Sequence, residues 1–233
     1  MLESEHMSEA VERPPREAVI AARLRGQWST LVQSVGGNLP LINEEFAKMV
    51  REYQSGEGRS YHNLLHIGEV DKMLNKYRHR SRNFVALKFA GDGHDVIYVP
   101  GSETNEKDSA VYMTGIMNKL GIPASVIEET GRIILITKDH KTADDDVDGK
   151  LMIDADFAIF ASPKAEYDAY AQNIWQEYVV SGKVSEEDFR KGRGKLIEGW
   201  LKQERIFLTN EIREELEPLA RQNLERERLR LAS

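Results

Sequence analysis

Apolar residues recur at three- and four-residue intervals along most of the chain, and this spacing limits the fold more than any other feature of the sequence. In residues 16–35 it places Leu24, Trp28 and Leu31 on one face of a helix. Glycines, prolines and acidic turns end the segments that show it. No stretch alternates apolar and polar residues for long enough to indicate a half-buried strand. The pattern predicts an all-α protein.

Some parts of the chain are expected to differ from this pattern. Residues 1–16 are polar, so we expect an N-terminal tail followed by one helical domain over residues 17–233. Residues 82–98 are apolar but contain glycines, and they suit a buried helix or a strand. Residues 141–150 are typical of an acidic loop. Further helices are expected within residues 42–54, 62–80, 100–121, 123–140, 163–180, 185–203 and 210–231.

The composition excludes several kinds of site. The 233 residues include no cysteine, so disulfides, thiolate metal ligands and a cysteine nucleophile are excluded. The net charge of −7 argues against a basic surface for nucleic acid, although a local metal ion could still attract a small phosphorylated ligand. No run approaches the ~18 consecutive apolar residues of a membrane span, and we expect a cytoplasmic protein. The oligomeric state is not predicted.

A metal site must then use histidine and carboxylate, and the segment RSYHNLLHIGEV (residues 59–70) contains the first candidates. His62 and His66 stand four residues apart, a spacing that would place both on one face of a helix. The zinc-protease motif H-E-x-x-H is not met, because Asn63 stands where glutamate is needed. The spacing alone fits a metal site and an ordinary helix equally well.

Acidic and histidine side chains also interrupt apolar stretches farther along the chain. His94 and Asp95 stand in GHDVIY, where a buried carboxylate would be costly unless a metal, a cap or a salt bridge compensates it. Asp154 and Asp156 stand in KLMIDADFAIF, where one of them would also suit a helix cap. His140 ends the run ILITKDH. Together with the first histidine segment, these residues would provide a set of nitrogen and oxygen ligands.

The order of these motifs resembles the HD superfamily of metal-dependent phosphohydrolases, in which a histidine, a His-Asp pair and a later aspartate follow one another along an all-α chain. YHNLLHI, HDVIY, NEKDSA, ILITKDH and DADF occur in the order found in a bacterial-type family of predicted HD phosphohydrolases. YHN, HD and AD are also similar to motifs of class I cyclic-nucleotide phosphodiesterases. The resemblance covers most of residues 20 to 225, and it implies an HD-domain helical bundle.

The resemblance also implies the identity of the metal ligands. Asp156 is preferred to Asp154 as the last of them, because the family's motif is Ala-Asp followed by an apolar residue. One divalent ion is expected, and Mn, Fe, Co, Ni, Zn and Mg all suit such a site. The implied ligands are His66, His94, Asp95 and Asp156.

The remaining motif residues would surround the metal. His62 resembles the general acid of the phosphodiesterases, which protonates the leaving oxygen. Glu106 and His140 resemble residues beside the first metal or at a second one, and any second ion is expected near His140. Arg59 would contact the phosphate, or form a surface salt bridge instead.

These residue types suit the hydrolysis of phosphoesters. A divalent ion lowers the pKa of a bound water towards ~7 and polarises a phosphoryl oxygen. A histidine that protonates the departing oxygen contributes ~10²–10⁴-fold to the rate. We therefore expect a hydrolase that cleaves a phosphomonoester or phosphodiester of a small, nucleotide-like substrate.

Two alternatives remain open. An HD fold without turnover could serve as a metal-binding or interaction module. The acidic segment 144–155 also matches part of a calcium loop, because Asp144, Asp146 and Asp148 fall at its first three ligand positions. Ala155, however, stands where a calcium loop needs a bidentate glutamate. Calcium binding is the less favoured alternative.

Overall fold

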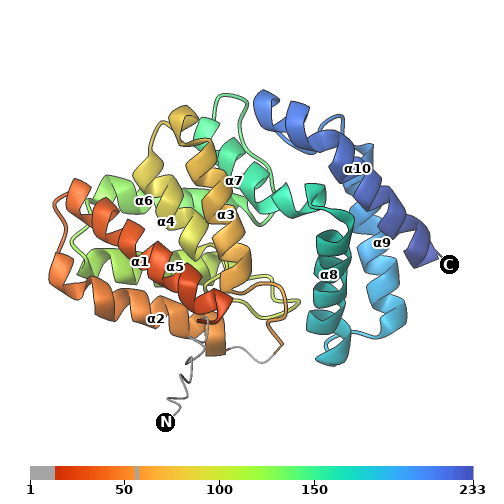
Figure 1. Cartoon of the computed structure of the whole chain (residues 1–233), viewed down its shortest axis with the longest axis horizontal. Helices are drawn as coiled ribbons and strands as arrows, with labels where there is room; N and C mark the ends of the chain where they lie inside the picture. Colours follow the sequence, from red (N-terminus) through yellow and green to blue (C-terminus); the bar gives the residue numbers. More distant parts are fainter. Residues whose placement is uncertain (1–13, 56–57, 233) are drawn as a thin grey trace, which may run out of the picture.

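The computed structural model describes residues 14–55 and 58–232, and most of this part of the chain is helical (Figure 1). Ten α-helices and several short helical turns occur in the described residues, with no strand, so the all-α prediction is confirmed. The α-helices are α1 (Arg16–Ser34), α2 (Ile42–Ser55), α3 (Leu64–Lys76), α4 (Phe84–Gly93), α5 (Asn105–Lys119), α6 (Ala124–Ile136), α7 (Val147–Phe157), α8 (Lys164–Trp175), α9 (Glu186–Lys202) and α10 (Asn210–Ala232).

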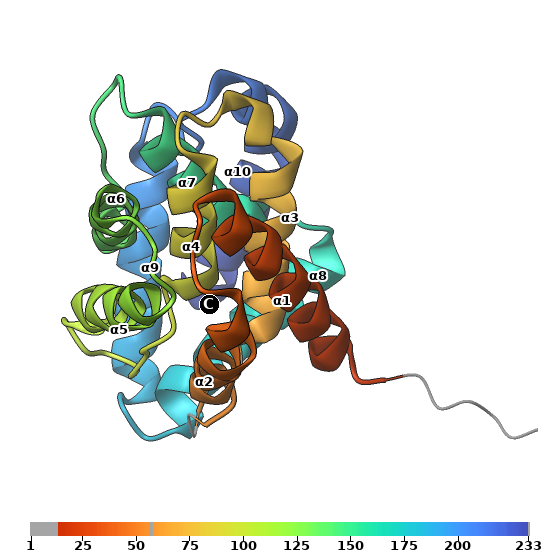
Figure 2. The same cartoon turned by 90° about the vertical axis from the view of Figure 1, so that its left-hand side faces the viewer.

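The helices form two groups that share one core. Figure 1 shows α1 to α7 on one side of the molecule and α8 to α10 on the other, and Figure 2 views the first group from its own side. The turn η3 (Ala158–Ala161) joins α7 to α8 and packs against α10. One continuous set of buried apolar side chains runs through both groups, from Trp28 on α1 through Phe89 on α4 to Leu224 on α10. The bundle is therefore a single domain.

The ambiguous segment 82–98 contains a helix, α4, in which every residue from Ala86 to Gly93 is buried. Its glycines permit close packing. A Cβ on Gly91 would lie 2.4 Å from Cδ1 of Leu74 on α3, and a Cβ on Gly93 would lie 2.4 Å from Cγ of Met113 on α5. α4 therefore lies close to both neighbours, and it ends at the histidine of the His-Asp motif.

α3 begins at Leu64, later than the sequence predicted. Asn63 explains this start, because its side-chain oxygen accepts a hydrogen bond from the backbone N–H of Leu65 (2.9 Å) and so caps the helix. His62 consequently lies in the turn before α3, whereas His66 lies within the helix. The prediction that the two histidines share one helical face is wrong.

The acidic segment 141–150 is a shorter loop than predicted, because α7 begins within it. Asp146 caps α7 by accepting a backbone N–H from the first turn (3.0 Å). The carboxylate of Asp148 accepts the backbone N–H groups of Arg82 (3.0 Å) and Asn83 (2.7 Å). These two carboxylates have separate structural partners and do not converge on one centre, so the geometry does not support a calcium loop.

The predicted N-terminal tail, residues 1–16, lies almost entirely outside the described residues, and α1 begins at Arg16. Within the part of the chain that the structure describes, no helix combines the length and the hydropathy needed to cross a membrane.

Candidate metal centre

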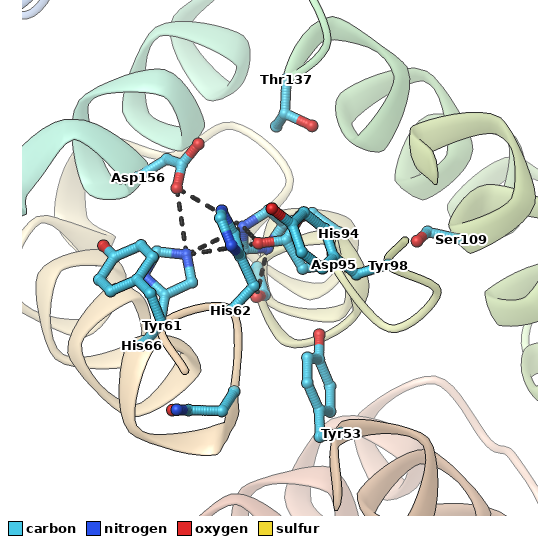
Figure 3. Close-up of polar contacts among 12 residues, drawn as sticks. Tyr53, Tyr61, His62, His66, His94, Asp95, Tyr98, Ser109, Thr137 and Asp156 are labelled. Atoms are coloured by element: carbon cyan, nitrogen blue, oxygen red, sulfur yellow. Dashed lines mark hydrogen bonds and ion pairs between the residues drawn. The ribbon is translucent and has the colours of Figure 1, made fainter. Parts of the chain in front are cut away.

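The histidine of α3 and the histidine that follows α4 face each other in the interior. His66 is 5% exposed and His94 is 1% exposed, and their Nε2 atoms lie 3.3 Å apart (Figure 3). Nδ1 of His94 lies 3.1 Å from the carbonyl oxygen of Gly91, which accepts but cannot donate. A neutral His94 therefore donates from Nδ1 and directs the lone pair of Nε2 towards His66. A metal ion can bind between two ring nitrogens that face each other in this way.

Two carboxylates approach the same pair of nitrogens. Oδ1 of Asp156, on α7, lies 3.1 Å from Nε2 of His66 and 3.6 Å from Nε2 of His94. Oδ2 of Asp95 lies 3.6 Å from Nε2 of His66 and 3.1 Å from Nε2 of His94, so it is closer to His94. The ligand atoms of His66, His94 and Asp156 all lie within 4.8 Å of one another and could hold a metal ion. The structure thus brings together all four residues that the resemblance implied.

The separations between these ligand atoms fit a metal centre. Atoms that lie ~2.1 Å from a metal are ~3.4 Å apart around a tetrahedral ion and ~3.0 Å apart at neighbouring octahedral positions. Within the group of His66, His94 and Asp156 the three separations range from 3.1 to 3.6 Å. Imidazole and carboxylate donors together suit several divalent ions, so the donor set does not select one of them.

The charges at this centre call for a cation between the carboxylates. Burial lowers the pKa of His94, but Asp95 and Asp156 more than offset it and raise that pKa well above its ordinary value. Burial raises the pKa of both carboxyl groups, but the neighbouring histidines more than offset it and hold both well below their usual range. The carboxylates therefore stay ionised, and a proton on the imidazole or a divalent ion balances them.

Asp154 lies on the same helix as Asp156 but has a different role. It is 0% exposed, and its two oxygens accept the backbone N–H groups of Leu208 (2.6 Å) and Thr209 (2.7 Å), just before α10. Burial raises its pKa to about 6, although these hydrogen bonds favour the ionised form. Since both oxygens are engaged away from the histidines, the geometry favours Asp156 as the last ligand.

His140 contacts the outer oxygen of Asp156. Its Nε2 lies 2.9 Å from Oδ2, whereas Oδ1 faces the histidine pair. The His140 backbone has a φ of 50°, which is uncommon for a residue with a side chain, and its ring stacks on Phe157 at a centroid distance of 4.3 Å. Such support fixes the orientation of a ligating carboxylate. A second ion near His140 stays a prediction.

His62 lies beside the centre and is held by Glu177, a residue that sequence analysis did not single out. Nδ1 of His62 lies 2.6 Å from Oε2 of Glu177, while Oε1 accepts the backbone N–H groups of Tyr61 (2.6 Å) and His62 (2.9 Å). Burial lowers the pKa of His62, but Glu177 and the carboxylates of the centre more than offset it and raise that pKa. Glu177 is 0% exposed. Its position as the one acid in the mostly apolar segment IWQEYVV (residues 174–180) was the available signal.

Arg59 supports the chain that follows His94 through one end of its guanidinium, whereas Nη1 is buried and has no hydrogen-bond partner among the described residues. Nη2 donates to the carbonyl oxygens of Asp95 (2.8 Å) and Val96 (3.0 Å). The guanidinium also lies over the ring of Tyr98, 5.7 Å from its centroid. The role of Arg59 in binding phosphate stays a prediction.

Glu106 lies in the first turn of α5, and it lines neither of the two cavities described below that reach the centre. Its catalytic role stays a prediction. Two neighbours of Glu106 hold the loop after the His-Asp motif: Oδ1 of Asn105 accepts the N–H of Val99 (2.9 Å) and Oγ of Ser109 accepts that of Ile97 (3.0 Å).

Two cavities reach the centre. The aromatic cavity, of about 670 Å³, is lined by His62, His140 and Asp156 together with residues of α8 and α9. The α3 cavity, of about 620 Å³, is lined by His66, Asp156 and residues of α3 and α8. Tyr61 and Asp156 line both. Both volumes lie within the ~300–1,000 Å³ typical of small-molecule sites.

Comparisons of the chain with protein-family models, with curated proteins and with solved structures found no match. The activity of a relative therefore offers no guide to this protein. The function has to be argued from the residues of the centre and from the cavities beside it.

Proposed function

We propose that the protein is a metal-dependent phosphohydrolase of the HD type that cleaves a phosphomonoester or phosphodiester of a small, nucleotide-like substrate. The observation that carries this proposal is the convergence of His66, His94 and Asp156 within 4.8 Å. Asp95 is the fourth proposed ligand. The resemblance of the ordered motifs to the HD superfamily and the all-α fold agree with it.

The chain itself fixes the proposed ligands in place. A divalent ion bound there would lower the pKa of a bound water and polarise a phosphoryl oxygen. The carbonyl group of Gly91 accepts the Nδ1 proton of His94 and so keeps its Nε2 free. His140 holds the outer oxygen of Asp156. Both supports orient donor atoms before any ligand arrives.

His62 is suited to protonate the leaving oxygen. Glu177 engages Nδ1, which leaves Nε2 as the ring nitrogen for a substrate. The ring lies beside the centre, 6.1 Å from that of His66 between centroids, and it lines the aromatic cavity. A raised pKa keeps more of the imidazole protonated near neutral pH, and protonation is what a general acid requires.

A screen of divalent ions against phosphomonoesters and phosphodiesters tests the proposal. The metal-loaded wild-type protein should hydrolyse members of the panel, and His62→Ala should lose ~10²–10⁴-fold in kcat while it keeps its metal. His79→Ala is the matched control, because His79 is an exposed histidine beside Glu211, away from both cavities. It should retain wild-type activity.

Two results would count against the proposal. Metal-loaded protein that hydrolyses no phosphoester would leave the centre as a binding site without turnover. Loss of metal in His62→Ala would make His62 a ligand instead of a proton donor.

A further inference from the structure

We infer that the leaving alcohol of the substrate carries a planar ring, and that this ring binds in the aromatic cavity between η3 and α9. This inference rests on the proposed function, because it starts from the side of the centre on which the alcohol departs. It narrows the substrate to phosphoesters of ring-bearing alcohols, such as nucleotides or phosphorylated heteroaromatic alcohols.

The position of the proposed acid decides which cavity receives the alcohol. His62 lines the aromatic cavity and does not line the α3 cavity, whereas His66 lines only the α3 cavity. A general acid must lie within hydrogen-bonding reach of the oxygen that it protonates. The departing alcohol therefore extends from the centre into the aromatic cavity.

A chain of aromatic contacts leads from the centre into this cavity, and its members Phe157 and Phe160 are themselves buried, at 5% and 3% exposed. His140, which contacts Asp156, stacks on Phe157, and Phe157 contacts Phe160 at a centroid distance of 4.8 Å. Phe160 in turn contacts Trp200 on α9, also at 4.8 Å. All of these residues line the cavity. We call Phe157, Phe160 and Trp200 the aromatic wall.

Two features suit this wall to a ligand. Trp200 is half-buried, so part of the indole remains accessible although the Arg193 guanidinium lies over the ring, 5.4 Å from its centroid, and Leu196 on the same cavity is 56% exposed. Planar heterocycles stack on aromatic side chains with little dependence on their substituents. The wall therefore fits a planar ring better than an open-chain polyol.

The buried cation of this cavity does not offer an alternative place for the phosphate. Arg193 is 6% exposed, and its guanidinium already donates to Glu227 (2.9 Å) and to the hydroxyl of Tyr170 (2.9 Å). A charge that is paired in this way is not free to bind a phosphate. The other cation on this cavity, Lys138, is exposed and donates to the carbonyl oxygen of Glu103 (2.7 Å). The phosphate would therefore lie at the metal centre and the ring along the aromatic wall, against the accessible part of Trp200.

Matched substrates test the inference on the metal-loaded protein. Adenosine 5′-monophosphate and ribose 5-phosphate share the same ester and differ by the base, and the other nucleoside 5′-monophosphates and pyridoxal 5′-phosphate extend the series. Ring-bearing esters should have a KM lower by about tenfold than ribose 5-phosphate, as expected for one stacked ring. Trp200→Leu should remove this difference, whereas Trp175→Leu, a tryptophan that does not line the cavity, should keep it.

A binding measurement separates this inference from the proposed function. Adenosine and pyridoxal, which lack phosphate, should change the fluorescence of the wild-type protein and of Trp175→Leu, but not that of Trp200→Leu. If no ester is hydrolysed, the proposed function fails, and this titration then decides on the ring site alone. If ribose 5-phosphate is hydrolysed with the same KM as the nucleotides, or the ring compounds do not bind, the inference is overturned and the proposed function stands.

Discussion

Glu177 should control the proton on His62, and replacing its charge offers a sharp test of the proposed acid. Glu177→Gln keeps the shape but removes the charge that faces Nδ1 of His62 at 2.6 Å, and the amide offers one accepting oxygen where the carboxylate offers two. A hydrogen bond to a charged group contributes ~1.5–3 kcal/mol, and ~1.4 kcal/mol corresponds to one pKa unit. The loss of this interaction should therefore lower the pKa of His62.

The sign of the effect on activity follows from the role of the acid. A general acid works in its protonated form, so activity should fall as the pH rises through the pKa of His62. In Glu177→Gln this alkaline limb of kcat/KM should move to lower pH. Because the pKa of His62 is raised in the folded protein, its interaction with Glu177 also stabilises the fold. This stabilisation is complete below pH ~6.5, the ordinary pKa of histidine, and is lost as the pH rises through the pKa of His62 in the folded protein. The substitution should remove that stabilisation.

The assay combines two readouts. NMR titration of the His62 ring proton, assigned with His62→Ala, gives the pKa directly, and the pH profile of kcat/KM gives its consequence. Glu225→Gln is the control, because Glu225 pairs with Arg228 on the surface of α10 and should leave both readouts unchanged. A His62 pKa that is the same in Glu177→Gln and in the wild type would refute the reasoning.

Three further substitutions test the hydrogen bonds of Asp154, the support that His140 gives to Asp156, and the packing of α4 against α5. Asp154→Ala should lower the melting temperature, because the partly buried backbone N–H groups of Leu208 and Thr209 lose their acceptor, at a cost of up to ~1–3 kcal/mol each, yet metal content should stay at the wild-type level. His140→Ala should weaken metal binding ~10–100-fold in a calorimetric titration, since it removes the support of Asp156; unchanged affinity would show that His140 does not orient the carboxylate. Gly93→Ala should cost ~1–3 kcal/mol in denaturant unfolding, because the new Cβ meets Met113; wild-type stability would mean that α4 and α5 are not so closely packed.

The sequence predicted the helices well because most of them have one apolar face. It could not decide the segment that contains α4, since a helix buried on every side shows no periodicity. The structure shows why this helix contains glycines: Gly91 and Gly93 lie where a side chain would collide with α3 and α5. The start of α3 was also missed, although Asn63 is a favourable N-cap residue.

The candidate centre was predictable to the extent that its motifs lie in order along the chain. His66, His94 and Asp156 converge as the resemblance implied. The roles of residues away from the ligands were not predictable, because they depend on contacts between distant segments. Glu177 reaches His62 from far along the sequence, and Nη2 of Arg59 donates to the carbonyl groups of Asp95 and Val96.

Metal content is the most direct test of the central claim. The purified protein is supplemented in turn with Mn, Fe, Co, Ni, Zn or Mg and then freed of excess ion. Elemental analysis should find about one divalent ion per chain, because the four nitrogen and oxygen donors form one centre. His94→Ala and Asp156→Ala should retain almost none while their far-ultraviolet circular dichroism stays helical, and His79→Ala should match the wild type. If His94→Ala and Asp156→Ala bind as much metal as the wild-type protein, the assignment of the centre is wrong.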